Sequence, residues 1–432
     1  MNNGNPHIVI IGAGFAGLWA VRTLSGKNVQ VTLIDKNNYH TFLPLLYQVG
    51  AAEIEPEGIA YPIRSLIRKY SNIKYLRSEV SDLDLDSKTL IANGRKISFD
   101  YCIIATGCTT NFFGIPGAES VCFKLKTLDD AVIIRNHILT CFERAAFCTG
   151  IERQNSLLTF TIVGGGPTGV EFAGALAELL YGPMRKDYPE YDINKARIVL
   201  IESSSRLLGM LPDALSSYTL KKLQSLGVEV MLETSVENIT PMGVKIKEGA
   251  TVESETILWC AGVKGPVEAS GWRIPLAKDG RITVSEDLRI KDYENVYAAG
   301  DAAWFEFNGK PLPQTAPVAI QQGVMAAENI LRQIKGSQTL PFRFVDKGAM
   351  VTIGRNSAVA NFAGMKFKGF FAWIIWLVIH LTNLIGFRNK IIVLINWSID
   401  YFLFERAVRL ILPSCCNEPG FVSCLRRRRD KQ

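Results

Sequence analysis

Residues 7–17 read HIVIIGAGFAG, and this short stretch decides the fold that the chain is expected to adopt. The apolar run His7–Ile11 predicts a strand covered on both faces, as in a parallel sheet. Gly12, Gly14 and Gly17 follow it and open a predicted helix. This spacing gives a tight turn and lets the backbone approach a pyrophosphate at the helix N-terminus. The stretch therefore predicts a dinucleotide-binding turn.

The same pattern recurs far along the chain. Residues 159–169 read TFTIVGGGPTG, which is again an apolar strand followed by glycines at Gly164, Gly166 and Gly169. One G-x-G-x-x-G motif is weak by itself. Two complete strand–turn–helix copies favour two bound dinucleotides over two ligand-free turns, and so electron transfer between cofactors.

Each unit also carries an acidic residue at the end of its next predicted strand. Asp35 lies 18 residues after Gly17, and Glu202 lies 33 residues after Gly169, the excess being taken up by an expected loop over 181–195. Such an acid binds a ribose 2′-hydroxyl and repels a 2′-phosphate. The pattern therefore favours NADH over NADPH.

Composition excludes several classes of protein. The 432 residues are 48% hydrophobic and 21% charged, which is typical of a folded chain of two to three domains. A net charge of +7 is too diffuse to indicate nucleic-acid binding. The nine cysteines form no C-x-x-C pair, and with four histidines they predict no metal site. No basic and apolar leader precedes the first strand, so we expect no secretory or transit peptide.

Two further segments resemble the paired motifs of two-dinucleotide-binding flavoproteins. They are DYCIIATG over residues 100–107 and VYAAGD over residues 296–301. The resemblance implies that Asp301 bonds the ribityl chain of FAD and that the NADH unit is nested within the FAD domain. The expected fold class is α/β, with two Rossmann-like domains and a C-terminal membrane-associating helical region. The expected domains are the first part of the FAD domain (1–122), the NADH domain (123–264), the second part of the FAD domain (265–345) and the membrane-anchoring region with a basic tail (346–432).

At a finer level the chain resembles the type II NADH:quinone oxidoreductases. The resemblance covers the chain to about Leu412, and its C-terminal motifs are the most diagnostic. It rests on FLPLLYQV (42–49), AYPIR (60–64), GGGPTGVE (164–171), AIQQG (319–323), IGRNSAVA (353–360) and GFRNK (386–390). It implies hydride transfer from NADH to FAD and then reduction of a membrane quinone, without proton pumping.

The resemblance also assigns roles to residues. It places Glu171 beside the nicotinamide–flavin contact, Gln321 in the segment that lines the quinone tunnel, and Lys347 near flavin and quinone. Pro317 stands where relatives have a glutamine, which leaves the quinone preference open. The expected cofactor-binding residues are Gly12, Gly14, Gly17, Asp35, Lys36, Thr106, Gly107, Gly300 and Asp301 for FAD, and Gly164, Gly166, Gly169, Glu202 and Gly262 for NADH.

Two apolar segments near the C-terminus differ from the α/β units. Residues 370–387 carry no formal charge, and residues 391–404 form a second apolar stretch. They could lie on a membrane surface, span it as a hairpin, or form a buried or dimer-forming pair. The resemblance favours peripheral attachment on the cytoplasmic side of the inner membrane, and homodimerisation is common in relatives. Trp373, Trp376 and Trp397 are the expected interfacial anchors, and the run 426–429 (RRRR) is expected to attract anionic lipid.

Two rival functions remain open. A sulfide:quinone oxidoreductase needs two redox cysteines beside the flavin, and no cysteine lies between Cys260 and Cys415. An FAD- and NADH-binding redox sensor, or a reductase with another acceptor, is kept open by Pro317. The first rival predicts that sulfide reduces the flavin, and the second predicts a reduced flavin that hardly responds to quinone.

Overall fold

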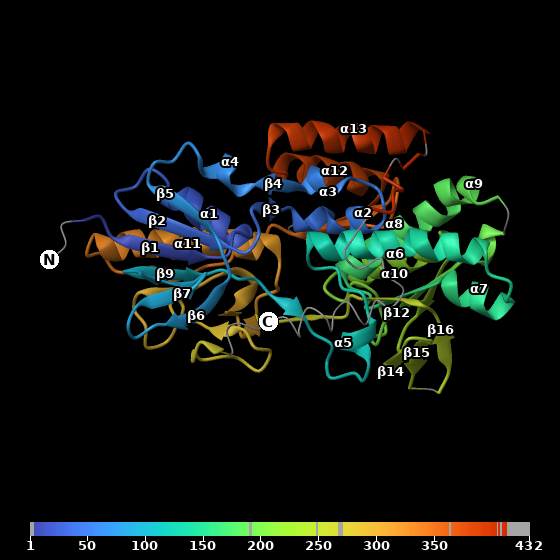
Figure 1. Cartoon of the computed structure of the whole chain (residues 1–432), viewed down its shortest axis with the longest axis horizontal. Coiled ribbons are helices and arrows are strands. Elements are labelled where there is room, and N and C mark those ends of the chain that lie inside the picture. The colour runs from blue at the N-terminus through green and yellow to red at the C-terminus, as the bar shows by residue number, and fades with distance from the viewer. Residues whose placement is uncertain are drawn as a thin grey trace. The chain divides into compact units, whose positions relative to one another are not determined.

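The computed structural model describes residues 4–189, 192–247, 249–266, 271–362, 364–403, 405–406 and 408–412 (Figure 1). The chain forms two compact units, each made of three segments. The first unit runs to Thr41 and continues in Ala60–Thr109 and Val263–Lys347. The second contains Phe42–Ile59, Thr110–Gly262 and the described residues from Gly348 onward.

The first unit is built on a five-stranded parallel sheet in the order β20-β9-β1-β2-β5. Helices α1 and α11 pack on one face, and the antiparallel strands β6, β7 and β8 cover the other (Figure 1). The apolar run of β1 is therefore shielded on both sides, as its sequence predicts. The bounds are β1 (His7–Ile11), α1 (Phe15–Leu24), β2 (Gln30–Asp35), β5 (Ile73–Arg77), β6 (Val80–Asp84), β7 (Thr89–Ala92), β8 (Arg95–Ser98), β9 (Tyr101–Ile104), β20 (Val296–Ala298) and α11 (Ala316–Ile334).

The second unit repeats this design on a four-stranded parallel sheet in the order β13-β12-β11-β17. It too carries three antiparallel strands, β14, β15 and β16. This repetition bears out the duplication read from the two glycine motifs. The bounds are α6 (Leu128–Ala146), β11 (Thr159–Val163), α8 (Pro167–Leu179), β12 (Arg197–Ile201), α10 (Asp213–Ser225), β13 (Val228–Met231), β14 (Val236–Thr240), β15 (Gly243–Ile246), β16 (Thr251–Glu253) and β17 (Thr256–Trp259).

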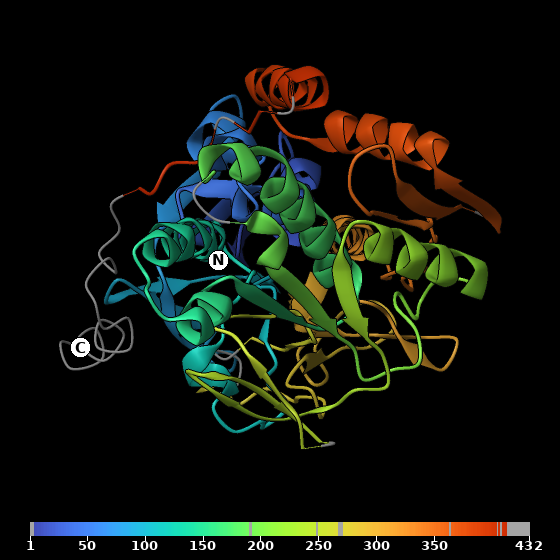
Figure 2. The ribbon, with the colours of Figure 1, turned by 90° about the vertical axis from the view of Figure 1, so that its right-hand side faces the viewer.

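The C-terminal part of the second unit consists of an antiparallel sheet and two helices. Strands β24 (Ala349–Thr352), β25 (Ala358–Phe362) and β26 (Met365–Gly369) lead into α12 (Phe370–Asn383), and α13 (Phe387–Leu403) follows. The two helices lie side by side (Figure 2). Among the described residues, no helix is both long and apolar enough to cross a membrane.

Two local expectations are corrected. The break between the C-terminal helices falls at residues 384–386, where Gly386 has a φ of +90°, and not at 388–390. Residues 388–390 lie in the first turn of α13. Asn389 is buried there, and its side-chain amide donates to the carbonyls of Glu57 and Gly58. The expected loop over 181–195 is partly helical: it contains a π-helix (Leu180–Met184), α9 (Arg185–Asp187) and a 3₁₀ turn (Ile193–Lys195).

The remaining elements are short connections. They are β3 (Tyr39–Thr41), a 3₁₀ turn (Leu43–Leu45), α2 (Leu46–Gly50), α3 (Pro56–Ile59), β4 (Ala60–Pro62), α4 (Ile63–Ile67), β10 (Thr109–Thr110), α5 (Ala118–Val121), α7 (Ile151–Leu157), β18 (Val263–Lys264), β19 (Ile282–Thr283), a 3₁₀ turn (Gly300–Ala302), β21 (Ala303–Trp304), β22 (Glu306–Phe307) and β23 (Lys310–Pro311).

Candidate functional site

The first glycine turn joins β1 to α1 in a conformation that only glycine permits. Gly12 has a φ of +102°, and a Cβ atom there would lie 2.3 Å from the carbonyl oxygen of Ala105. A Cβ on Gly17 would lie 1.8 Å from the carbonyl oxygen of Gly12. At Gly14 a Cβ would meet nothing within 4 Å, so this side of the turn is open. The turn is therefore packed tightly behind and free in front, as a phosphate cradle requires.

The acid of the first unit lies against this turn. The amide of Ala13 donates to Asp35 Oδ2 (2.6 Å) and that of Asn37 to Oδ1 (2.7 Å). Burial raises the pKa of Asp35, and these two hydrogen bonds oppose the rise. Lys36, the next residue along the chain, is exposed. The carboxylate is thus fixed at the carboxyl end of β2, next to the open side of the turn.

Two motifs from distant parts of the chain meet at the same sheet edge, because β20 pairs with β9. Thr106 follows β9, and its buried Oγ1 has no hydrogen-bond partner among the residues that the structure describes. A Cβ on Gly107 would meet nothing within 4 Å. The Cys108 thiol donates to Asp301 Oδ2 (3.1 Å). An unpaired hydroxyl and open backbone beside a carboxylate fit a polar ligand such as a flavin dinucleotide.

Two residues of the first unit that the sequence reading missed support this edge. Gln322 is buried on α11, and its Oε1 accepts from the amide of Gly300 (2.8 Å), which fixes the turn before Asp301. His40 is 2% exposed, and its Nδ1 lies 2.9 Å from the carbonyl oxygen of Ala13, while its Nε2 has no partner. Burial lowers the pKa of His40 to about 4, so the ring is neutral. Neither side chain belongs to a glycine motif, so only the structure reveals them.

The second glycine turn repeats the first almost atom for atom. Gly164 has a φ of +111°, and a Cβ on Gly169 would lie 1.9 Å from the Gly164 oxygen. Glu202 Oε2 accepts from the amide of Gly165 (2.6 Å), and its Oε1 accepts from the amide of Ser204 (2.7 Å). A Cβ on Gly166 would meet nothing within 4 Å. This turn is likewise open toward a dinucleotide.

Gly262 lies three residues after the end of β17, in the second unit. A Cβ there would lie 2.5 Å from the ring of Phe113, and the Gly262 carbonyl accepts from the amide of Asn111 (3.0 Å). A side chain at this position would displace the Phe113 ring, which is 60% exposed. The geometry therefore explains the glycine by packing, and its role toward a cofactor stays a prediction.

Glu171 lies in the first turn and a half of α8, directly behind the second glycine turn. Its Oε1 accepts a long hydrogen bond from the amide of Thr352 (3.4 Å). Burial raises the pKa of Glu171 to about 8; the Thr352 amide and Trp376 lower it, and the charge of Glu53 raises it. At neutral pH this carboxyl group is therefore mostly protonated, and it can donate a hydrogen bond or a proton.

Glu171 lines a cavity of about 470 Å³ within the second unit. Its walls come from α2, α8, α12, α13 and the start of the C-terminal sheet, and they are largely apolar. Trp397 Nε1 donates to Gln48 Oε1 (3.0 Å), and Gln48 Nε2 donates to Tyr47 Oη (3.1 Å), so a short polar chain faces the cavity in addition to the carboxyl groups and Arg355 that line it. Such a cavity suits an aromatic ligand with a few polar atoms.

The expected role of the three tryptophans as interfacial anchors is wrong for Trp376. Its side chain is buried at 1% exposure and stacks on His380, with a centroid distance of 4.1 Å. Trp373 stacks on Tyr401 (5.6 Å), and Trp397 is tied to Gln48. All three line the cavity, because they lie on the sides of α12 and α13 that face the unit's interior.

Gln321 and Lys347, the other two expected catalytic residues, belong to the first unit and do not line this cavity. Gln321 Nε2 donates to the carbonyls of Pro317 (3.1 Å) and Val345 (3.0 Å), and its Oε1 accepts from the amide of Val345 (2.9 Å). Its amide group therefore holds the segment that leads to Lys347. Lys347 itself is exposed. Their roles toward quinone stay predictions.

Comparison with known proteins agrees with this arrangement. Residues 6–323 match the pyridine nucleotide-disulphide oxidoreductase family, and residues 347–407 match the NDH2 C-terminal domain. The type II NADH:quinone oxidoreductase Ndh of Mycobacterium tuberculosis is 36% identical over 414 residues, which cover 92% of this chain and 89% of the relative. That of Staphylococcus aureus (strain NCTC 8325) is 30% identical over 380 residues, covering 85% and 92%.

Solved structures show the same fold. NDH2 from Plasmodium falciparum in complex with NADH superimposes with a TM-score of 0.87 at 22% identity, covering 95% of this chain and 100% of that one. The sulfide:quinone oxidoreductase of Aquifex aeolicus reaches a TM-score of 0.69 at 19% identity, covering 95% and 93%. At these identities the likeness concerns the fold alone.

Proposed function

The chain belongs to the type II NADH:quinone oxidoreductases of the pyridine nucleotide-disulphide oxidoreductase family, and we propose that it oxidises NADH through FAD and reduces a membrane quinone. The observation that carries this proposal is the position of Glu171. It lies on the helix that begins at the second glycine turn, and it also faces the apolar cavity. One helix thus serves a nucleotide site and an acceptor site.

The two glycine turns divide the cofactors between the units. FAD, when bound, accepts a hydride from NADH and passes two electrons on. In the first unit we propose that Asp35 holds the ribose and Asp301 the ribityl chain, with the Thr106 hydroxyl as a further partner. In the second unit Glu202 is placed to bind the NADH ribose 2′-hydroxyl. Its negative charge disfavours the 2′-phosphate of NADPH.

Glu171 acts as a neutral acid in this scheme. Burial keeps its carboxyl protonated near neutral pH, so it can donate a hydrogen bond to a carbonyl oxygen without placing a negative charge beside the reacting rings. The largely apolar walls of the cavity accept the ring and first isoprenoid units of a quinone. Gln321 and Lys347 are proposed to act at the flavin side of the quinone path.

Peripheral membrane attachment is supported by the outer faces of α12 and α13. Five large apolar side chains there are between 55% and 78% exposed. A group of exposed apolar side chains, unlike a single one, is typical of an interaction surface. They are Phe371, Val378, Phe387, Phe402 and Leu403. We propose that this face lies on the cytoplasmic side of the inner membrane and that the basic run 426–429 draws anionic lipid. The basic run 426–429 lies outside the described residues, and homodimerisation stays a prediction.

Anaerobic stopped-flow spectroscopy of the full chain tests the function. NADH is mixed first and a short-chain quinone second, while flavin absorbance is followed. We expect rapid bleaching by NADH and rapid recovery with quinone. Bleaching without recovery would instead indicate a sensor or a reductase with another acceptor. Asp301→Ala should lose FAD, and a variant that keeps stoichiometric flavin would contradict the assignment of the first unit.

A sulfide-driven reaction is the third outcome to exclude. It needs reactive thiolates, yet burial raises the pKa of both Cys122 and Cys260 to about 12. These thiols stay protonated at neutral pH and are poor nucleophiles. Sulfide in place of NADH should therefore leave the flavin oxidised.

A further inference from the structure

A single arginine is buried next to the cavity and joins three of its walls. Arg406 follows α13, and its side chain is 1% exposed. Its Nη1 donates to the carbonyls of Ala51 (2.9 Å) and Ala175 (2.7 Å), which follow α2 and lie on α8. The remaining guanidinium nitrogens face carboxylates. A fully buried arginine of this kind persists only where its charge is compensated.

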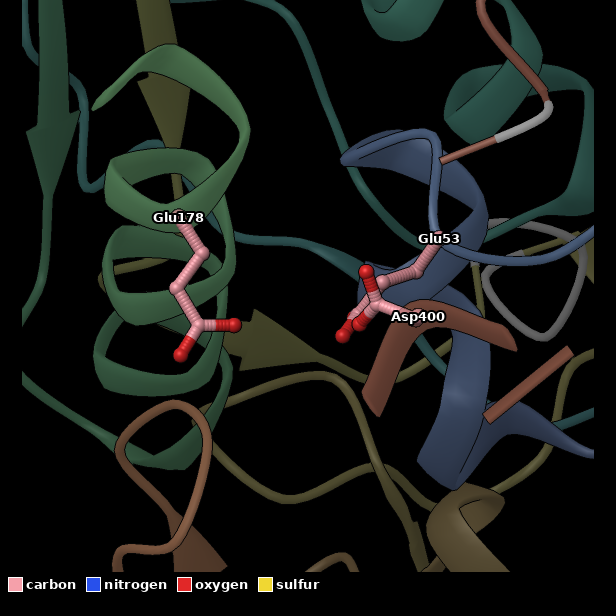
Figure 3. A group of neighbouring side chains, drawn as sticks. All are labelled: Glu53, Glu178 and Asp400. Carbon is pink, nitrogen blue, oxygen red and sulfur yellow. The ribbon is translucent and has the colours of Figure 1, made fainter. Parts of the chain in front are cut away.

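Three carboxylates surround this arginine, one from each wall. Arg406 Nη2 lies 3.1 Å from Glu178 Oε2 and 3.4 Å from Glu53 Oε1, and its Nε lies 3.7 Å from Asp400 Oδ1. The three acids each place an oxygen within 4.8 Å of the others (Figure 3). We call Glu53, Glu178, Asp400 and Arg406 the Arg406 cluster. The Arg406 guanidinium contacts all three acids.

The charges of this cluster do not balance if every acid is ionised. Three carboxylates then face one guanidinium, with Arg355 as a second cation whose amide donates to Glu178. Burial raises the pKa of Glu53; Arg406 lowers it, and Asp400 and Glu178 raise it. Burial also raises the pKa of Glu178, against Arg406 and the Arg355 amide. The cluster therefore retains an exchangeable proton near neutral pH.

The other titratable groups near the cluster come from two helices. Tyr47 on α2 and Glu171 on α8 line the same cavity, and the charge of Glu53 raises the pKa of both. Tyr47 and Glu171 are both uncharged in the middle of the pH range, since burial raises the pKa of each. Glu171 is therefore a second protonated carboxyl in the cavity, and the Arg406 cluster differs from it because its proton is shared among several charged groups.

A second observation indicates that the cavity takes an oxygen-bearing ligand. Trp376 lines it at 1% exposure, and its indole N–H lies close enough to Glu171 to lower the pKa of that carboxyl, yet it makes no hydrogen bond of ordinary length and angle within the part of the chain that the structure describes. A buried donor without a partner costs free energy, which a carbonyl oxygen would recover. Glu53, Glu178 and Asp400 line the same cavity and are 12–21% exposed. The cluster and the unpaired donor thus face one ligand.

We propose that the Arg406 cluster supplies a proton to the quinone as it is reduced in this cavity, an inference that rests on the proposed function. A quinone that takes up a hydride equivalent carries two electrons, one proton and one negative charge. One further proton makes the quinol. A carboxyl group of the cluster gives up this proton, becomes ionised beside Arg406, and is reprotonated from water. Arg406 is a positioning residue that stabilises the ionised state.

The test compares two acceptors in the full-length protein. A short-chain quinone needs protons to become quinol, whereas ferricyanide takes one electron and no proton. In Glu178→Gln and Asp400→Asn we expect flavin reoxidation by quinone to slow at least about tenfold, with a changed pH profile. Bleaching by NADH and reoxidation by ferricyanide should stay within about twofold of the wild type. Equal slowing with both acceptors, or slowing with neither, would overturn the proposal.

A matched control and a variant-free measurement complete the design. Glu255 is 12% exposed, pairs with Arg144 and Arg153 in the same unit and does not line the cavity. Glu255→Gln should leave the ratio of the two reoxidation rates unchanged. In the wild type, flavin reoxidation by quinone should slow as pH rises from 6 to 9, whereas reoxidation by ferricyanide should not. A pH-independent ratio would overturn the inference. No quinone-dependent recovery at any pH would instead overturn the proposed function.

Discussion

The two glycine turns are nearly identical, and the helices that follow them are not. In both turns the first glycine has a positive φ. A Cβ atom added to the last glycine of either turn would lie less than 2 Å from the carbonyl oxygen of the first. Two residues further on, α1 carries Trp19 and α8 carries Glu171. Trp19 packs between Phe15 and Arg22, whereas Glu171 faces the cavity. The turn therefore sets nucleotide binding, and the next helical turn sets what is done with it.

The largest effect is expected at the closest glycine contacts. Gly17→Ala and Gly169→Ala place a methyl group on a backbone oxygen that cannot move away, so each should cost about 5 kcal/mol or prevent folding. Thermal denaturation and flavin content would measure both effects. A mild loss in only one of the two variants would show that the two turns are not equivalent.

The middle glycines serve as matched controls within the same turns. Gly14→Ala and Gly166→Ala meet no protein atom within 4 Å, so both variants should fold. The new methyl groups would occupy the open side of each turn. We expect Gly14→Ala to weaken flavin retention and Gly166→Ala to weaken bleaching by NADH, and unchanged cofactor binding would contradict the orientation of the turns.

Glu171→Gln tests the difference between the two helices. The pKa of Glu171 is raised from 4.5 to about 8 in the folded protein, so the folded state binds more protons than the unfolded state between these values. Wild-type stability should therefore fall as pH rises through this window and level off above it, by about 5 kcal/mol from this group. The variant should lose less stability over the same window. Parallel curves, measured by denaturant unfolding at several pH values, would contradict a raised pKa.

A smaller contrast is expected where each nucleotide helix packs. A Cβ on Gly323 of α11 would lie 2.1 Å from the carbonyl oxygen of Ala16 on α1. A Cβ on Gly174 of α8 would lie 2.9 Å from the carbonyl carbon of Ile353. Gly323→Ala should cost about 3 kcal/mol and Gly174→Ala about 1 kcal/mol. Chemical denaturation gives both values, and the reverse order would show that α8 is the more tightly held helix.

The smallest effect concerns the acids that follow the turns. Replacing Glu202 by alanine together with the exposed Ser203 by arginine should reduce the preference for NADH over NADPH about tenfold, or roughly 1.4 kcal/mol. Steady-state kinetics with both nucleotides would measure the ratio. Asp35→Ala is the control, because the acid of the first unit should leave nucleotide choice unchanged. A shift in that variant would exchange the roles of the two units.

How much could be predicted from the sequence follows from the range of the interactions involved. The strand–glycine–helix pattern depends on contacts a few residues apart, so the sequence could predict the fold class, the duplication and the family resemblance. All three predictions are confirmed. The Trp376 anchor was wrong because an apolar stretch alone does not say which side of a helix meets the protein. The helical start of residues 181–195 was missed because its polar, proline-containing composition suggested a loop.

The sequence by itself determined two nucleotide-binding units, an acid for each, and an apolar C-terminal region. It named Glu171 through its motif but did not say that burial holds it protonated. Only the tertiary structure gathers Glu53, Glu178, Asp400 and Arg406, which span more than 350 positions of the chain, around one cavity. Local spacing fixes turns because their atoms are neighbours along the backbone. Charge sharing depends on distances and on exclusion of water, and these exist only once the chain has folded.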